Sequence, residues 1–208
     1  MSPLLRWLPL VAASLLAGCA SVSSTNPPQA SSVAEINQQQ LASLASIHEF
    51  SMQGRIGVQT EGKGFSGSSH WQHDGQNDNI ALFSPLGGQV ATIIASNDGV
   101  QLVTSDGKIF RAADVETLTQ QNLGWSLPMR GLPDWILGRP TASPVQLQQW
   151  DEAGRLTRLQ QDGWDIEYAQ YADTGGYQLP GKVTLLSPKL NLKLIIEHWQ
   201  INPTKNAD

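Results

Sequence analysis

The chain has 208 residues, with 13 lysines and arginines against 18 aspartates and glutamates, and a formal net charge of −5. This charge argues against a nucleic-acid partner, because phosphate contacts need concentrated basic residues and none are clustered here. The single cysteine excludes an intramolecular disulfide and disfavours a thiolate metal site. We expect no metal and no other cofactor.

The N-terminus has the three parts of a secretory signal: Arg6, an uncharged apolar run from Trp7 to Ala17, and small residues at the end. The apolar run is too short to span a bilayer. It ends in LAGC, which resembles the bacterial lipobox, whose cysteine becomes the acylated N-terminus of the mature protein. We therefore predict a signal peptide at residues 1–18 and lipid attachment at Cys19. An ordinary cleaved signal with a chance cysteine is the alternative.

Residues 19–44 are rich in Ser, Gln, Asn, Pro and Ala and lack an apolar stripe until their end. Such a segment buries too little apolar surface to offset its ordering entropy, so we predict a flexible tether. Residues 33–50 can form a short helix leading into the fold. Ala20 and Ser21 follow the cysteine, where enterobacterial lipoproteins retained in the inner membrane carry aspartate. The resemblance therefore implies the outer membrane, facing the periplasm.

Residues 45–203 are expected to form one domain, followed by a disordered tail at 204–208. From Phe50 onward, apolar and polar residues alternate with a period of two, which is typical of strands. Asn97-Asp98-Gly99 and Asp106-Gly107 are hairpin signals within this run. The strands predicted up to residue 112 are FSMQGRIGV, GFSGSSHWQ, NIALF, QVATIIA, VQLVT and KIFRA.

Two helices interrupt the strands. DVETLTQQNLGW predicts a helix that is capped by Asp114 and ends at Gly124. LPDWILG predicts a second, short helix, with Pro133 near its start and Gly138 after its end. The alternation then returns in VQLQQW, RLTRLQQ, WDIEYAQY, KVTLLS and LNLKLIIEHWQI.

We therefore predict a mainly β fold of about eleven strands and two or three helices. So many strands in one small domain must form a sandwich or curl into a barrel. Helices inserted between two runs of strands favour a curled antiparallel sheet, a half-open barrel, with the helices as a lid over an apolar cavity. Either face of a curled strand can be the interior, so the candidate cavity-lining residues are hypotheses: Met52, Ile56, Phe65, Trp71, Leu82, Trp135 and Ile136.

Two motifs in the second strand resemble catalytic signatures but lack their context. GKGFSG matches G-x-G-x-x-G, yet no helix follows to face a pyrophosphate. GFSGS nearly matches the nucleophile elbow, but Ser68 replaces the second glycine. His70 and His73 lie three residues apart on a strand, so they face opposite sides and cannot share a metal ion. We predict no catalytic residues and no enzyme activity.

Acidic residues occur singly. Asp74, Asp78 and Asp98 fall in predicted turns, where carboxylates cap backbone amides. Six of the seven tryptophans belong to the mature domain, where they can pack in the core or line an apolar cavity.

The lipobox, the helix in LPDWILGRP and the turn SPLGG occur in an order that resembles the LolB family of outer-membrane lipoprotein receptors, from about Phe50 to Trp199. The resemblance implies a half-open barrel whose apolar cavity holds acyl chains. It also implies a protruding loop with an exposed leucine that delivers lipoproteins to the membrane. That loop falls on Pro85, Leu86 and Gly87, while Gly88 departs from the family pattern.

The function implied by this resemblance is that of a monomeric receptor. It accepts triacylated lipoproteins from a LolA-like periplasmic carrier and inserts them into the inner leaflet of the outer membrane, without nucleotide hydrolysis. Two alternatives stay open. A hydrolase of envelope lipid or peptidoglycan would need a nucleophile among residues such as Ser66, Ser68, His70 and His73. A structural lipoprotein would bind another protein and leave no cavity.

Overall fold

The computed structural model describes residues 32–202. The predicted signal peptide, the predicted attachment site at Cys19 and the predicted tail at 204–208 lie outside the described residues. None of the helices within residues 32–202 is both long and apolar enough to cross a bilayer.

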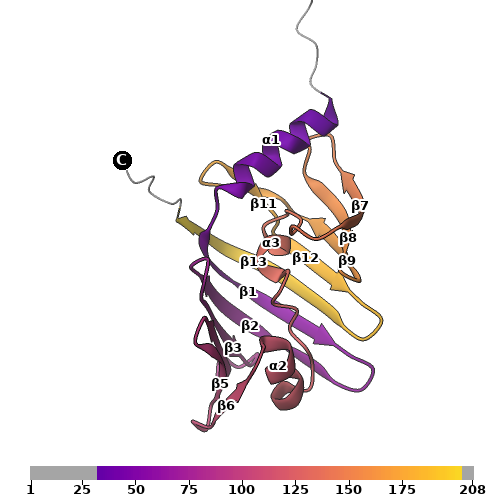
Figure 1. The fold of residues 1–208 in the computed structure, drawn as a ribbon. Coiled ribbons are helices and arrows are strands. Elements are labelled where there is room, and N and C mark those ends of the chain that lie inside the picture. Colours follow the sequence, from indigo (N-terminus) through magenta and orange to yellow (C-terminus); the bar gives the residue numbers. More distant parts are fainter. Residues whose placement is uncertain (1–31, 203–208) are drawn as a thin grey trace, which may run out of the picture. The chain divides into compact units, whose positions relative to one another are not determined.

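One antiparallel sheet of eleven strands dominates the described residues, and it does not close into a barrel (Figure 1). The strand order is β6-β5-β4-β3-β2-β1-β13-β12-β9-β8-β7, so β6 and β7 are the free edges. These are the eleven strands predicted from the alternation. Their bounds are β1 Glu49–Gln59, β2 Gly64–His73, β3 Asp78–Phe83, β4 Gln89–Ser96, β5 Gly99–Thr104, β6 Ile109–Ala112, β7 Val145–Trp150, β8 Leu156–Gln161, β9 Trp164–Ala169, β12 Lys182–Leu186 and β13 Asn191–Asn202.

A second, two-stranded sheet was not predicted. β10 (Ala172–Thr174) and β11 (Tyr177–Leu179) pair with each other around Gly175 and Gly176. No strand was predicted between WDIEYAQY and KVTLLS. Strands of three residues are too short to show a period of two, which explains the omission.

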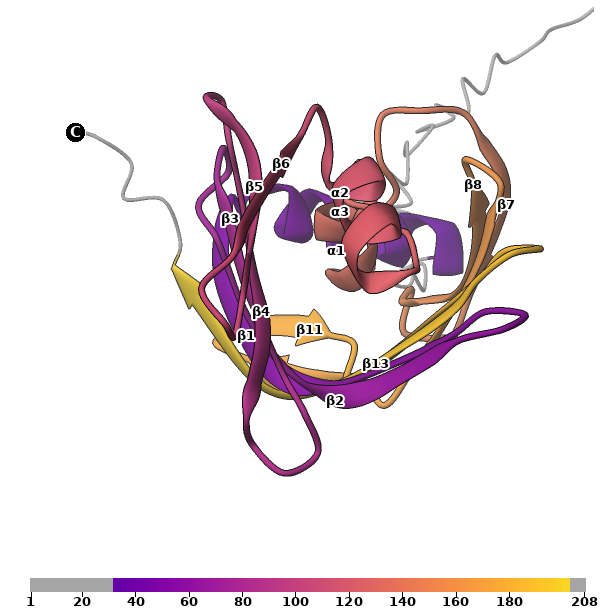
Figure 2. The same ribbon diagram turned by 90° about the horizontal axis from the view of Figure 1, so that it is seen from below.

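The sheet curls (Figure 2), and its buried, concave face carries apolar side chains. Along β1 alternate residues are buried, from Phe50 through Met52 and Ile56 to Val58, as the period predicted. Neighbouring strands continue this face, because directly paired residues point to the same side of a sheet. Met52, for example, pairs with Trp71 of β2.

Helix α1 (Val33–Ala45) begins with a capping box, in which Ser32 and Glu35 each bond the other's backbone amide. It is fixed to the sheet by buried Asn37, whose amide donates to the carbonyl of Gly154 over 2.7 Å. Residues 33–44 of the segment predicted as tether therefore belong to a packed helix. The contact of this helix with the sheet was not predicted, because the helix has few apolar residues and is anchored by a polar asparagine.

Helices α2 (Val115–Leu123) and α3 (Leu132–Ile136) lie inside the curl of the sheet (Figure 2). Both agree with the sequence signals. The Asp114 carboxylate accepts the backbone N–H of Thr117, and Gly124 ends α2 in the left-handed conformation. Pro133 stands in the first turn of α3.

The hairpin turns define two ends of the sheet. We call one the Leu86 end; it carries the turns 60–63, 84–88, 105–108, 162–163 and 187–190. The other, the α1 end, carries the turns 74–77, 97–98 and 151–155, the connection 113–114 and the segment 170–181 that contains β10 and β11.

Candidate functional site

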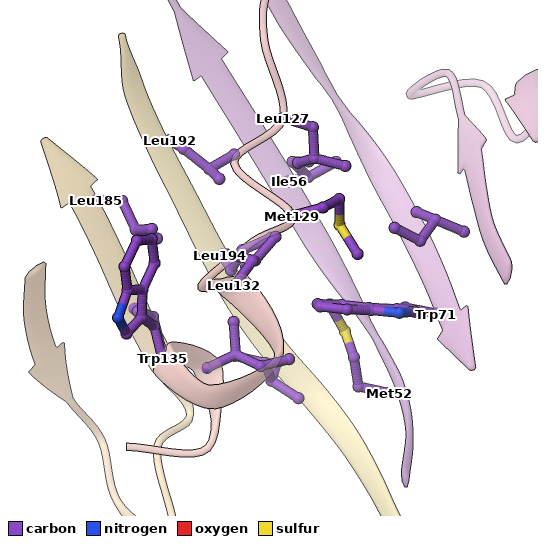
Figure 3. Packing of buried hydrophobic residues seen from close by; sticks show 14 of the residues in the cluster. Met52, Ile56, Trp71, Leu127, Met129, Leu132, Trp135, Leu185, Leu192 and Leu194 are labelled. Atoms are coloured by element: carbon purple, nitrogen blue, oxygen red, sulfur yellow. The ribbon is translucent and has the colours of Figure 1, made fainter. Parts of the chain in front are cut away.

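The concave face of the sheet is covered by residues 125–137, which we call the lid segment. Seven of its side chains are buried in the same apolar cluster as the strands: Trp125, Leu127, Met129, Leu132, Trp135, Ile136 and Leu137. Figure 3 shows Leu127 near Ile56, Met129 directed toward Trp71 and Leu132 near Leu194. In this structure, protein side chains thus lie where the predicted cavity places acyl chains.

Buried Gln161 of β8 holds the lid segment in position. Its side-chain oxygen accepts the indole N–H of Trp135 over 2.9 Å and the backbone N–H of Thr141 over 3.0 Å. Its amide nitrogen donates to the carbonyls of Thr141 and Ser143. Each side-chain polar group of Gln161 is therefore paired, as burial of an amide requires. The sequence did not predict this role of Gln161, because a glutamine in an alternating strand is expected to face solvent.

At the other end of the lid segment, Thr119 of α2 donates to the carbonyl of Val115 and accepts the backbone N–H of Leu127 over 3.0 Å. Thr119 and Gln161 thus fix the two ends of the lid segment by hydrogen bonds, while its middle is held by apolar contacts and one bond from the Arg130 N–H to Glu116 of α2.

Six of the seven candidate cavity-lining residues are buried in the apolar cluster: Met52, Ile56, Trp71, Leu82, Trp135 and Ile136. Phe65 is only partly buried and stacks on Trp125, with ring centroids 6.4 Å apart. Their contact with acyl chains stays a prediction. Sequence reasoning missed Leu127, Met129 and Leu132 of the lid segment, although apolar residues spaced around Pro128 between two helices were a signal for them.

Tyr168 of β9 is an exception to the apolar character of this face. Its hydroxyl is buried and has no hydrogen-bond partner in the described part of the chain. Burial, together with the nearby Tyr171 and Asp134, raises the pKa of Tyr168 well above its ordinary value, so the group is a neutral hydroxyl.

Asp78 does not cap a turn as the sequence suggested. Its carboxylate accepts the indole N–H of Trp71 over 2.7 Å and bonds Nδ1 of His73 over 2.8 Å. Phe50 stacks on the His73 ring, with centroids 5.0 Å apart. The prediction holds for Asp74, whose carboxylate accepts the side-chain amide of Asn77 and the backbone amides of Asn77 and Gln76, and these bonds lower its pKa.

The residues considered for a hydrolase are not assembled into a catalytic group. Ser66, Ser68 and His70 lie on the convex face of β2, and His73 lies on the opposite face. Within residues 32–202, no hydrogen bond joins a serine hydroxyl to a histidine.

The Leu86 turn is short and well defined. The Ser84 carbonyl accepts the N–H of Gly87 over 2.9 Å, and the Ser84 N–H donates to the Gly88 carbonyl over 2.8 Å. Gly87 has φ of 85°, a left-handed conformation in which a side chain would be strained. These constraints leave Leu86 at the tip with 98% of its surface exposed. The turn is therefore rigid enough to present one apolar side chain to the surroundings.

Comparison with known proteins supports a family assignment. A family model described as outer membrane lipoprotein LolB matches residues 48–199. The outer-membrane lipoprotein LolB of Nitrosomonas europaea is 40% identical over 161 residues, which cover 76% of each chain. That of Thiobacillus denitrificans is 38% identical over 188 residues, covering 90% of this chain and 93% of the relative.

Solved structures share the fold at low sequence identity. A LolA superfamily protein from Nitrosomonas europaea matches with a TM-score of 0.50 and 10% identity, over 80% of this chain and 93% of the other. A DUF1329 family protein from Desulfovibrio piger matches with a TM-score of 0.53 and 8% identity, over 85% and 93%. At these identities the likeness concerns the fold alone.

Proposed function

Because the chain belongs to the LolB family of outer-membrane lipoproteins, we propose that it receives triacylated lipoproteins from a LolA-like periplasmic carrier and inserts them into the outer membrane. In this proposal the protein acts as a monomer, is held by acyl chains on Cys19 and faces the periplasm. The observation that carries the proposal is the open sheet whose apolar concave face is covered by a separate apolar segment.

The lid segment exchanges places with the cargo. Its buried side chains are of the same apolar character as fatty acyl chains, so cargo can replace them against the sheet without exposing the sheet to water. Within residues 32–202, no hydrogen bond joins residues 128–134 to the sheet, and the Arg130 N–H donates instead to Glu116 of α2. Displacement therefore breaks mostly apolar contacts, which the incoming chains restore.

Transfer requires direct contact between cavities. At ~0.8 kcal/mol per methylene group, exposing an acyl chain of about 15 methylenes to water costs ~12 kcal/mol. Cargo must therefore pass from one apolar host to the next without crossing solvent. Direction comes from differential affinity, with the receptor binding the chains more tightly than the carrier and the bilayer more tightly still. This scheme uses no nucleotide and no covalent step.

Leu86 acts at the delivery step, with Pro85 and Gly87 shaping the turn that presents it. An almost fully exposed leucine on a rigid turn adds nothing to the core, so its apolar surface is available to enter the membrane.

The test is a transfer assay with the lipidated protein, a carrier–lipoprotein complex and phospholipid vesicles. Burying a leucine in an apolar phase contributes ~2 kcal/mol, so Leu86→Glu is expected to slow delivery by about tenfold or more while cargo acceptance is kept. Its thermal unfolding midpoint should match the wild type, because the side chain is exposed. Gln89→Glu, a nearby exposed residue, controls for the added charge and should deliver normally.

Two results would contradict this role. Normal delivery by Leu86→Glu would show that the tip does not act on the membrane. A marked loss of stability in that variant would show that Leu86 serves the fold. If wild-type protein accepted no cargo from the carrier, the receptor function itself would be wrong.

A further inference from the structure

Exposed large hydrophobic residues gather at one end of the sheet. Among the described residues, Leu86 is 98% exposed and Ile109 is 51% exposed, and Phe110 and Val145 are exposed to a smaller extent; all four lie at the Leu86 end. Val33 and Trp150 are the other exposed large hydrophobics, and they lie toward the α1 end. Isolated exposed apolar residues need no explanation, but a group of them at one end of a sheet marks a contact surface.

Leu86 and Ile109 belong to neighbouring hairpins. β3, β4, β5 and β6 are consecutive in the sheet, so the turns 84–88 and 105–108 leave it at the same end. A bond of 3.1 Å from the backbone N–H of Ser105 to the carbonyl of Val90 ties the second turn to the strand that follows the first. The two apolar sites are therefore held in a fixed arrangement.

Ile109 and Phe110 project on opposite sides of edge strand β6. Phe110 pairs with Leu102, which is buried on the concave face, whereas Ile109 pairs with Val103 on the convex face. Neither serves mainly to fill the core, since both remain exposed at a free edge of the sheet. The start of β6 is thus apolar on both sides.

The charges of the molecule favour the same end for contact with a lipid surface. The turns of the Leu86 end carry equal numbers of acidic and basic residues: Glu61, Asp106 and Asp162 with Lys63, Lys108 and Lys189. The connections of the α1 end carry a large acidic excess: Asp74, Asp98, Asp114, Asp151, Glu152 and Asp173 with Arg155 alone. A surface of anionic phospholipid repels the α1 end and tolerates the Leu86 end.

The pairing of Asp106 with Lys108 keeps the second turn neutral. The two groups lie 2.6 Å apart, and bonds from Lys108 and Thr104 lower the pKa of Asp106 to about 2. The turn therefore carries one charge of each sign at any pH near neutrality.

We infer that Leu86, Ile109 and Phe110 form one membrane-docking surface, which seats the Leu86 end on the phospholipid leaflet that holds the lipid anchor. This inference rests on the proposed function and extends it. Leu86 is one of several contacts, and the sheet stands with its acidic α1 end away from the lipid. In this orientation the turns of the Leu86 end face the acceptor membrane during delivery.

The depth of single side chains tests the inference. Cys19 is the only cysteine, and acylation blocks its thiol, so an added cysteine can be labelled alone. Leu86→Cys, Ile109→Cys and Asp98→Cys variants are labelled with an environment-sensitive fluorophore. The lipidated proteins are placed in vesicles of phosphatidylethanolamine and phosphatidylglycerol that contain lipids with a quencher on the acyl chain. Labels at positions 86 and 109 should shift to shorter wavelength and be quenched. The label at position 98, in a turn of the α1 end, should behave as in water.

A matched pair of variants tests whether Ile109 contributes to docking. With the label at position 86, Ile109→Glu should reduce quenching, whereas Val33→Glu should not. Val33 is a suitable control, because it is similarly exposed, at 40%, but lies toward the α1 end. Equal thermal unfolding midpoints would exclude a general loss of structure.

The outcomes separate the two proposals. Quenching at position 86 alone would overturn the extended surface and leave the Leu86 tip intact. Delivery of cargo with no quenching at either position would overturn both the extended surface and the Leu86 tip, while the receptor function would stand. A spectral change at position 109 that appears only when the carrier protein is added would mean that this surface binds protein, and the inference would be wrong.

Discussion

Tyr168 is buried on the concave face of β9, and within the described residues its hydroxyl has no hydrogen-bond partner. Leu86 shows the opposite mismatch, since an apolar side chain is exposed at the tip of a turn. Neither residue is explained by stability, because folding favours buried apolar groups and paired polar groups. For Leu86 we propose a role in delivery. For Tyr168, the structure provides no explanation.

The cost of the unpaired hydroxyl can be measured with a matched pair of tyrosines. Tyr168→Phe should leave the free energy of unfolding unchanged or raise it by ~1 kcal/mol, because only an unsatisfied polar group is removed. Tyr171→Phe should lower it by ~1 kcal/mol, since the Tyr171 hydroxyl donates to the Leu156 carbonyl over 2.8 Å. Urea unfolding at neutral pH provides both values. A clear destabilisation by Tyr168→Phe would mean that its hydroxyl is bonded in solution.

At the scale of single elements, β2 shows why its glycines resemble a nucleotide-binding motif. The carbonyl of Phe83, in the neighbouring strand β3, lies directly over Gly67. A Cβ atom at position 67 would lie 1.9 Å from that oxygen. Gly67 is therefore required by the close approach of two strands, and sheet packing accounts for the last glycine of the match to G-x-G-x-x-G.

Replacement of two strand glycines tests this account. Gly67→Ala should lower the free energy of unfolding by at least ~2 kcal/mol, because the backbone of β3 must move. Gly57→Ala in β1 is the control, since a Cβ there meets nothing within 4 Å, and alanine should be neutral or stabilising by ~0.5 kcal/mol. Thermal or urea unfolding distinguishes the two. Equal stability of both variants would refute the packing explanation.

Across residues 32–202 as a whole, a broad sheet is combined with a weakly fixed lid segment. β1 pairs along its length with both β2 and β13, with one register shift between Gln53 and Gly54 on the β13 side, so long strand pairs form the centre of the sheet. By contrast, α3 has only five residues, and no side chain caps its start. Elements with few backbone bonds are the first to open in native proteins. The lid segment can therefore move while the sheet keeps its shape.

Hydrogen exchange of backbone amides should distinguish the lid segment from the sheet. When the protein is loaded with lipoprotein from the carrier, amides of the lid segment are expected to exchange faster, because their apolar contacts are replaced by acyl chains. Amides of β1 and β13 should stay protected in both states. Unchanged exchange of the lid segment in cargo-loaded protein would contradict displacement and require a separate binding place for the chains.

The sequence by itself determined the local structure of this protein. The eleven strands of the main sheet, the cap at Asp114, the end of α2 at Gly124 and the turn at Leu86 all follow from short-range patterns, because alternation and capping act between residues close in the chain. The same patterns determined that one face of the early strands is apolar.

Only the tertiary structure decided which side chains meet across that face. The curl of the sheet brings the lid segment onto strands far away in sequence and pairs Trp135 with Gln161. It also leaves the Tyr168 hydroxyl without a partner among residues 32–202 and places Leu86 and Ile109 at the same end. These relations depend on strand order and curvature, which arise from packing between distant segments, and no local pattern specifies them.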